Sequence, residues 1–218
     1  MYLSRLTLNR SRRALFWAAR PYRVHQRLTM ACPPPTDSGA GGPVAERLLY
    51  RIEANHDATI ILVQSPALPD WRAAFQDFAV LARPPEDKAL DWPLVEGQLL
   101  AFRLRANPTR RQVCDQPGGD GRKRRVGITD ELEQLAWLAR KGEAAGFRLL
   151  RALARQDGLL KDTQTRDDTP RSLAFLSVQF DGALQVLDPE RLRAGLAAGI
   201  GSGKALGFGL LSLAPLRG

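Results

Sequence analysis

The stretch Leu99-Leu-Ala-Phe-Arg-Leu-Arg-Ala106 decides the fold, because it begins a second copy of an element order that the chain has already completed once. Its alternation of apolar and polar residues predicts a strand. The clearest helix of the chain follows at Asp130 to Lys141, with Thr129 placed to cap its N-terminus. The apolar residues of this helix recur at helical spacing and form one face: Leu132, Leu135, Ala136 and Ala139.

The rest of the second half predicts further strands and one more helix. Asp181-Gly182 stands between apolar runs and predicts a hairpin turn. Asp188-Pro189 supplies a cap and a first helical residue, so a helix is expected after it. Residues 110–125 predict a polar, Gly-rich and basic connector. The expected strands are Phe147–Leu153, Leu173–Phe180, Leu184–Leu187 and Leu206–Leu213.

The first half has the same order of elements. Ser11–Met30 predicts helical structure in which Pro21 opens a second piece, and Asp70–Phe78 predicts another helix. The expected strands are Met1–Asn9, Glu46–Glu53, Thr59–Gln64 and a weaker stretch at Lys88–Val95. Each half thus approximates β-α-β-β-α-β, the ferredoxin-like unit. The sequence predicts an α+β protein with two tandem ferredoxin-like domains, residues 1–96 and 97–218.

The composition favours a nucleic-acid partner. The 218 residues carry a net charge of +9, and arginine, which suits bidentate phosphate recognition, dominates the basic residues. Arginine-rich coding in a GC-rich genome would explain the same excess. Two cysteines and two histidines argue against a disulfide framework and a tetrahedral zinc site, so no metal or cofactor is expected. The sequence shows neither a membrane span nor a signal peptide, so we expect a cytoplasmic protein.

Tyr22 and His25 are the first candidates for chemistry. They are three residues apart in the expected helix after Pro21, so a phenol and an imidazole would share one face. Arg20, Arg23 and Arg27 are expected to surround them, which would draw a phosphate toward the same place. RNA is cleaved without metal when its own 2′-hydroxyl attacks the adjacent phosphate, and histidine suits the proton transfers because its pKa lies near neutral. The spacing alone favours a simple packing or capping role.

Two other segments are candidates for phosphate binding. Gly199-Ile-Gly-Ser-Gly-Lys-Ala-Leu-Gly207 is neither a Walker loop nor a dinucleotide fingerprint, since its glycine spacing and its place after a helix are wrong for both. Its glycines and Lys204 could hold a phosphate backbone, or the segment could be a plain connection. The run Arg122-Lys123-Arg124-Arg125, with Arg110 and Arg111, favours phosphate contact. His56 is interpreted as an exposed turn residue, and Asp167-Asp168 as a loop feature.

Several stretches together resemble the CasE (Cse3) family, the CRISPR repeat endoribonucleases of the type I-E Cascade complex. They run from the first residue to nearly the last: Met1–Leu6, Tyr22–Leu28, Phe102–Pro108, Glu133–Leu138 and Gly199–Pro215. The sequence departs from the family pattern in a Pro/Gly-rich stretch at residues 32–42 and a polar, irregular stretch at 155–170.

The resemblance implies tandem ferredoxin-like, or RRM-like, domains and a partner RNA, the hairpin of the CRISPR repeat. It implies metal-independent cleavage at the 3′ base of the stem, leaving 5′-hydroxyl and 2′,3′-cyclic phosphate ends, by a protein that stays bound and joins the other Cascade subunits. It also implies that Tyr22 and His25 are the catalytic pair. The glycine segment, with Gly199, Gly201, Gly203 and Lys204, and the run from Arg122 would bind RNA.

Two other functions are weighed against this one. A non-catalytic RNA-binding scaffold on the same fold would stack bases on exposed aromatic residues of its sheets. The candidate strands Leu99–Ala106 and Leu206–Leu213 each offer a single Phe, so this mode is disfavoured. A nucleotide-dependent enzyme is disfavoured because the glycine segment matches neither phosphate-binding motif.

Overall fold

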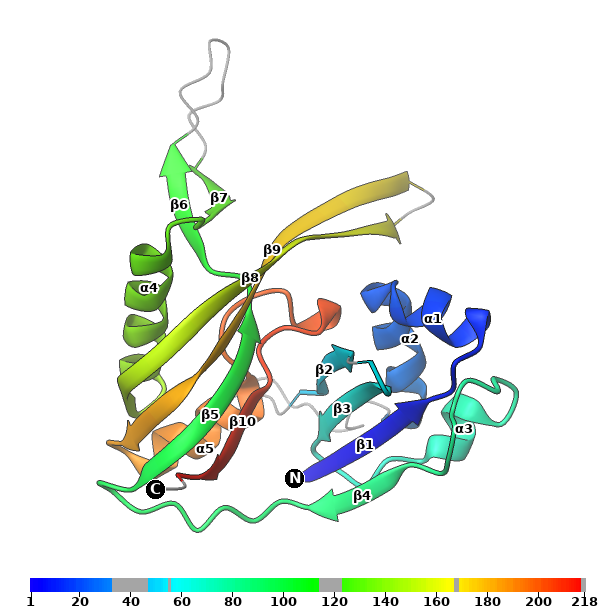
Figure 1. The fold of residues 1–218 in the computed structure, drawn as a ribbon, viewed down its shortest axis with the longest axis horizontal. Coiled ribbons are helices and arrows are strands. Elements are labelled where there is room, and N and C mark those ends of the chain that lie inside the picture. The colour runs from blue at the N-terminus through cyan, green and yellow to red at the C-terminus, as the bar shows by residue number, and fades with distance from the viewer. Residues whose placement is uncertain (33–46, 55, 114–122, 167–168, 217–218) are drawn as a thin grey trace, which may run out of the picture.

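A computed structural model describes residues 1–32, 47–54, 56–113, 123–166 and 169–216. The first half contains β1 (Tyr2–Leu8), α1 (Arg12–Ala18), α2 (Pro21–Ala31), β2 (Leu49–Ala54), β3 (Thr59–Ser65), α3 (Trp71–Phe75) and β4 (Glu86–Ala89). Its strands form an antiparallel sheet in the order β2-β3-β1-β4, with the helices on one side (Figure 1). This is the ferredoxin-like order that the sequence predicts.

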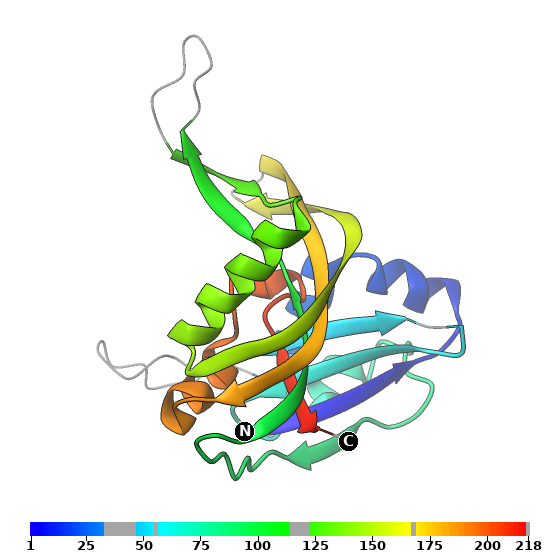
Figure 2. The ribbon, with the colours of Figure 1, turned by 60° about the vertical axis from the view of Figure 1, so that its left-hand side comes forward.

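The second half repeats that topology with longer strands. Its elements are β5 (Leu99–Ala106), β6 (Thr109–Val113), β7 (Lys123–Gly127), α4 (Glu131–Ala144), β8 (Phe147–Arg166), β9 (Thr169–Val186), α5 (Pro189–Ala198), the 3-10 turn η1 (Lys204–Leu206) and β10 (Leu211–Pro215). The sheet order β10-β5-β9-β8 matches that of the first sheet, and Figure 2 shows α4 lying along one face of the sheet. The two-domain α+β fold is therefore confirmed; its predicted boundary at residue 96 stays a prediction.

Each sheet packs its helices over a separate apolar core. The first core includes Leu6, Val24 and Leu28, and the second includes Trp137, Phe147 and Phe180. Val24 and Leu28 lie one helical turn apart on α2, so the buried stripe of this helix faces the sheet and its other faces point away from the core. The packing of α2 thus leaves Tyr22 and His25 only half-buried.

Buried polar side chains of the first half join it to the second. Arg51 in β2 is 2% exposed and donates hydrogen bonds to the carbonyl of Leu210 at 3.1 Å and to Ser212 Oγ at 3.0 Å. Gln64 in β3 is also buried and donates to the carbonyl of Leu196 at 2.7 Å. A buried polar group is stable only with its hydrogen bonds made, so these side chains fix the two halves relative to each other.

The hairpin turn predicted at Asp181-Gly182 is wrong. Both residues lie inside β9, which runs on to Val186. A Cβ at position 182 would lie 2.1 Å from the carbonyl oxygen of Arg151, at a register shift of β8. The glycine is there because two strands approach each other closely, which gives the same dipeptide signal as a turn.

Other element limits also differ from the prediction. The connector at 110–125 contains strands β6 and β7, which pair as a two-stranded sheet, and the polar stretch after Leu153 continues β8 up to Arg166. Asp130, not Thr129, caps α4 by accepting a hydrogen bond from the Glu133 amide at 2.8 Å. The last strand starts at Leu211, because the glycine segment extends further than expected. None of the helices in the described ranges is long and apolar enough to cross a membrane.

Candidate active site

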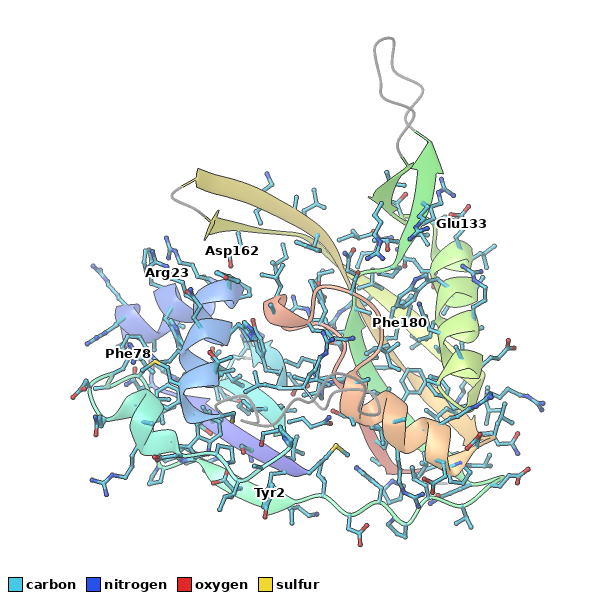
Figure 3. The ribbon with its side chains drawn as sticks, turned by 180° about the vertical axis from the view of Figure 1, so that it is seen from behind. Tyr2, Arg23, Phe78, Glu133, Asp162 and Phe180 are labelled. Carbon is cyan, nitrogen blue, oxygen red and sulfur yellow. The ribbon has the colours of Figure 1, made fainter. Side chains whose placement is uncertain are left out.

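The helix α2 holds the two predicted catalytic side chains on one face. Pro21 is its first residue, and the ring centroids of Tyr22 and His25 lie 6.5 Å apart. The N-cap residue, Arg20, makes no side-chain capping bond. Instead, Asp162 accepts a hydrogen bond from the Tyr22 amide at 2.7 Å. Asp162 lies where the paired ends of β8 and β9 extend from the second sheet as an arm. Figures 1 and 3 show this arm reaching across to α1 and α2, with Asp162 on the side that faces them.

The imidazole of His25 lies in a partly desolvated setting. The Tyr50 ring is close to parallel with it, at 16° and 6.4 Å between centroids. The Nδ1 atom is buried and has no hydrogen-bond partner among the described residues. Burial lowers the pKa of His25 below its ordinary value of 6.5, so the ring is neutral near pH 7. A neutral, half-buried imidazole can accept a proton, which is the form that general-base chemistry needs.

Tyr50 fixes the helix to the glycine segment. This tyrosine is fully buried, and its hydroxyl contacts the carbonyl oxygens of Pro21 at 2.5 Å and Ala205 at 3.2 Å. Burial raises the pKa of Tyr50 well above its ordinary value, so the hydroxyl keeps its proton and remains a donor. Gly207 packs against the same ring: a Cβ there would lie 3.1 Å from Tyr50 Cε2, and its φ of 82° suits glycine.

The glycine segment carries Lys204 to the end of α2. Lys204 begins η1, and together with Tyr22 it lines a pocket of about 400 Å³. Burial, with Arg47 and Lys141 adding repulsion, lowers the pKa of Lys204. Close packing accounts for some of the glycines, since a Cβ at Gly199 would lie 2.8 Å from Leu49. The segment therefore packs tightly against the first half of the chain, and its phosphate contact stays a prediction.

A broad basic groove continues from this pocket. The groove has a volume of about 950 Å³ and shares Gly201, Ser202 and Lys204 with the Tyr22 pocket. Among the described residues, seven cationic side chains and no acidic one line it: Arg110, Arg111, Arg125, Arg140, Lys141, Arg191 and Lys204. Arg110 is paired with Glu133 at 2.6 Å, on the exposed face of α4. A groove of one charge sign concentrates a polyanion along its length, so this groove fits a phosphate backbone.

The sequence profile of the CRISPR associated protein family matches residues 1–215. The chain belongs to this family. It is 37% identical over 226 residues to the CRISPR-associated endoribonuclease Cse3 of Thermus thermophilus, covering 99% of this chain and 100% of that one. It is 30% identical over 223 residues to the CRISPR system Cascade subunit CasE of Escherichia coli, covering 99% and 100%. A solved structure of CRISPR endoribonuclease Cse3 bound to a 19-nucleotide RNA superimposes with a TM-score of 0.80 at 37% identity, covering 99% and 100%.

The structure brings Tyr22, His25 and Lys204 together, and it places Arg110, Arg111 and Arg125 along the basic groove. Arg122 lies outside the described residues, and so do Asp167 and Asp168; for Lys123 and Arg124 only their place in β7 is described. His56 is exposed beside the β2–β3 turn, as expected. Across the described residues, no three His, Cys, Asp or Glu side chains converge to hold a metal ion.

One arginine prediction needs correction. Arg20, Arg23 and Arg27 do not surround the Tyr22–His25 face; they line a separate cavity on the neighbouring face of α2. The reason is geometric: residues 23 and 27 follow one another by one helical turn, on a different stripe from 22 and 25.

Four further residues of this site lie outside the sequence predictions. Tyr50 and Asp162 reach it through tertiary contacts, and no local pattern marks either of them. Arg140 and Arg191, by contrast, occupy exposed helix positions that a helical wheel could have marked.

Proposed function

We propose that this protein is a metal-independent endoribonuclease that cuts CRISPR precursor RNA. Cleavage would occur at the 3′ base of the repeat hairpin and leave 5′-hydroxyl and 2′,3′-cyclic phosphate ends. The protein would then stay on the mature RNA as a subunit of a Cascade complex, in the cytoplasm. The observation that carries the proposal is a half-buried, neutral His25 beside Tyr22, whose side chain lines the pocket that adjoins the seven-cation groove.

The chemistry follows from these groups. The ribose 2′-oxygen attacks the adjacent phosphorus, the bond from phosphorus to the 5′-oxygen breaks, and the cyclic phosphate forms. One proton leaves the 2′-hydroxyl and one reaches the departing 5′-oxygen. His25 serves this proton transfer because its lowered pKa keeps the accepting form available. Tyr22 orients or assists it, and Lys204 offsets the charge that develops on the phosphorane.

The basic groove supplies the binding surface for the hairpin stem. Arg110, Arg111 and Arg125 project from the β6–β7 hairpin, and Arg140 and Lys141 from α4, so the cations are spread over several elements. Arginine and lysine on a rigid surface bind the phosphates of a duplex in one register, which fixes where the strand enters the site. The relatives with RNA-bound structures and Cascade membership support the same assignment.

The test is cleavage of the host's own CRISPR repeat RNA in EDTA, with both product ends mapped. We expect wild-type protein to cut, and His25→Ala to lose cleavage while it binds the hairpin with nearly unchanged affinity. His56→Ala is the matched control, because it removes the other histidine from an exposed turn. Cutting by His25→Ala at the wild-type rate would refute the catalytic assignment. Intact RNA with the wild-type protein, despite tight binding, would favour a scaffold.

A further inference from the structure

A second cavity lies on the face of the catalytic helix next to that of Tyr22 and His25. It has a volume of about 520 Å³ and opens between α1 and α2, over Trp17 and Phe78 (Figure 3, which labels Arg23 and Phe78). From α2 it takes positions 23, 26, 27 and 30, a stripe adjacent to that of Tyr22 and His25. An α-helix with its side chains is about 10–12 Å across, so a few nucleotides of single strand can pass from one face to the other.

The lining of this cavity is cationic. Four arginines contribute to it, Arg13, Arg20, Arg23 and Arg27, and no acidic residue among those that the structure describes does. Within the described part of the chain none of the four forms an ion pair. Arg20 and Arg27 bond only to backbone carbonyls, each at 3.1 Å. Unpaired guanidinium groups at a cavity wall attract a polyanion, because each keeps N–H donors for phosphate oxygens.

The same cavity presents flat apolar surfaces. Phe16 is 60% exposed, and the guanidinium of Arg20 stacks on its ring at 3.4 Å. The guanidinium groups of Arg13 and Arg27 lie 4.5 Å and 4.6 Å from the centroid of Phe78. Aromatic rings and guanidinium planes are the surfaces on which proteins stack unpaired bases. The cavity thus combines N–H donors for phosphate oxygens with planar surfaces for bases. This combination matches a single-stranded nucleic acid better than an acidic peptide, which would use the positive charges but not the stacking surfaces.

We propose that this cavity binds the single-stranded nucleotides on the 3′ side of the scissile phosphate. The inference rests on the proposed function. With the stem in the basic groove on one side of Tyr22 and His25, the strand beyond the cut leaves toward the other side of α2. Binding of that strand would position the scissile bond on the face of α2 that holds Tyr22 and His25. It would also make the protein bind RNA that continues past the hairpin more tightly than RNA that has already been cut.

The test compares RNAs that cannot be cleaved because the attacking 2′-hydroxyl is replaced by hydrogen. Three are needed: the hairpin alone, the hairpin with a 3′ single-stranded tail, and the hairpin with a 5′ tail. For wild-type protein we expect the 3′ tail to tighten binding about tenfold over the hairpin alone, since each stacked base contributes substantially. The 5′ tail should add little.

The variant Phe16→Ala/Arg23→Ala should remove most of the 3′-tail gain and leave hairpin-alone binding unchanged. Both side chains are exposed, so folding is preserved. Arg12→Ala/Leu15→Ala is the matched control on α1, with one exposed arginine and one exposed apolar residue outside the cavity. The inference is overturned if the tail gives no gain, if the 5′ tail gives the same gain, or if the cavity variant keeps it. A tail without effect would leave the cavity to a protein partner. Binding and cleavage of the hairpin itself report separately on the proposed function.

Discussion

Arg51 offers the sharpest test of how the two halves are held together. Its guanidinium is 2% exposed, donates to the carbonyls of Leu210 and Arg103 at 3.1 Å and 3.3 Å, and pairs with Glu53 at 2.9 Å. Burial lowers the pKa of Arg51 and Glu53 opposes the shift. Arg51→Met keeps an unbranched apolar stem but removes every donor. The acceptors of the second half then lose their partner inside the interface.

The expected loss follows from those contacts. Each buried carbonyl left without a donor costs about 1–3 kcal/mol, and relief from burying a charge offsets part of the sum. We therefore expect Arg51→Met to lower the free energy of unfolding by about 2–4 kcal/mol. Arg103→Met is the matched control, because Arg103 also contacts Glu53 but its side chain is 44% exposed. An exposed pair contributes up to about 1 kcal/mol.

Urea unfolding followed by tryptophan fluorescence measures both variants, since tryptophans lie in both cores. Equal losses for Arg51→Met and Arg103→Met would mean that burial does not set the contribution of Arg51. A loss below about 1 kcal/mol for Arg51→Met would show that the interface repacks or hydrates without cost. The expectation that the carbonyl oxygens of Leu210 and Arg103 are destabilising without a donor would then be refuted.

Three further outcomes are expected. In an NMR titration, with His56→Ala to assign the signals, the imidazole of His25 should titrate below pH 6.5. Below that pH the unfolded chain binds more protons than the folded one. The free energy of unfolding should therefore fall as the pH drops through 6.5. A midpoint above 6.5 would contradict the desolvation argument. Asp162→Ala should lower the free energy of unfolding in urea by about 0.5–2 kcal/mol and slow single-turnover cleavage. Asp162→Asn still accepts a hydrogen bond from the Tyr22 amide, so it should recover much of the stability and of the rate. Equal defects in the two variants would argue against the importance of the Tyr22–Asp162 hydrogen bond. Gly182→Ala should cost about 2 kcal/mol or more in urea unfolding, because its Cβ meets backbone; a neutral effect would show that β8 can shift.

The sequence predicted the fold well where one local rule acts. The strand Leu99–Ala106 has the predicted limits, and Asp188 caps α5 by accepting from the Arg191 amide at 3.0 Å. Periodicity and capping depend on neighbours in the chain, so they are visible in the sequence. The local rules failed at α4, where Asp130 rather than Thr129 is the cap and the predicted apolar face is not the buried one: Leu132 is 77% exposed, whereas Trp137 and Leu138 are buried. The other failures come from tertiary packing. Gly182 has the composition of a turn and the role of a close strand contact, and only the register of β8 distinguishes the two.

The candidate site was predictable to the same extent. Tyr22 and His25 could be paired because they share a helix, whereas the residues that hold this helix in place come from distant parts of the chain. Asp162 is 140 positions from Tyr22, and the carbonyl of Ala205 is 155 positions from Tyr50. Contacts of that separation follow from the way the two domains dock, and a docking geometry is not encoded in any single window of sequence.

The two copies of one fold contribute different parts to a single candidate site. The proposed catalytic pair lies on α2 of the first half, and the basic groove lies on α4, α5 and the β6–β7 hairpin of the second. A misplacement of about 1 Å between reacting groups can cost a hundredfold in rate, so the halves must be held rigidly. Hydrogen-bonded buried polar groups suit this purpose better than an apolar interface, because hydrogen bonds are directional and Arg51, Gln64 and Tyr50 would lose theirs if the acceptors moved. Under the proposed function the interface between the halves would therefore be part of the catalytic apparatus, since it sets the position of the His25 imidazole relative to an RNA strand bound in the groove.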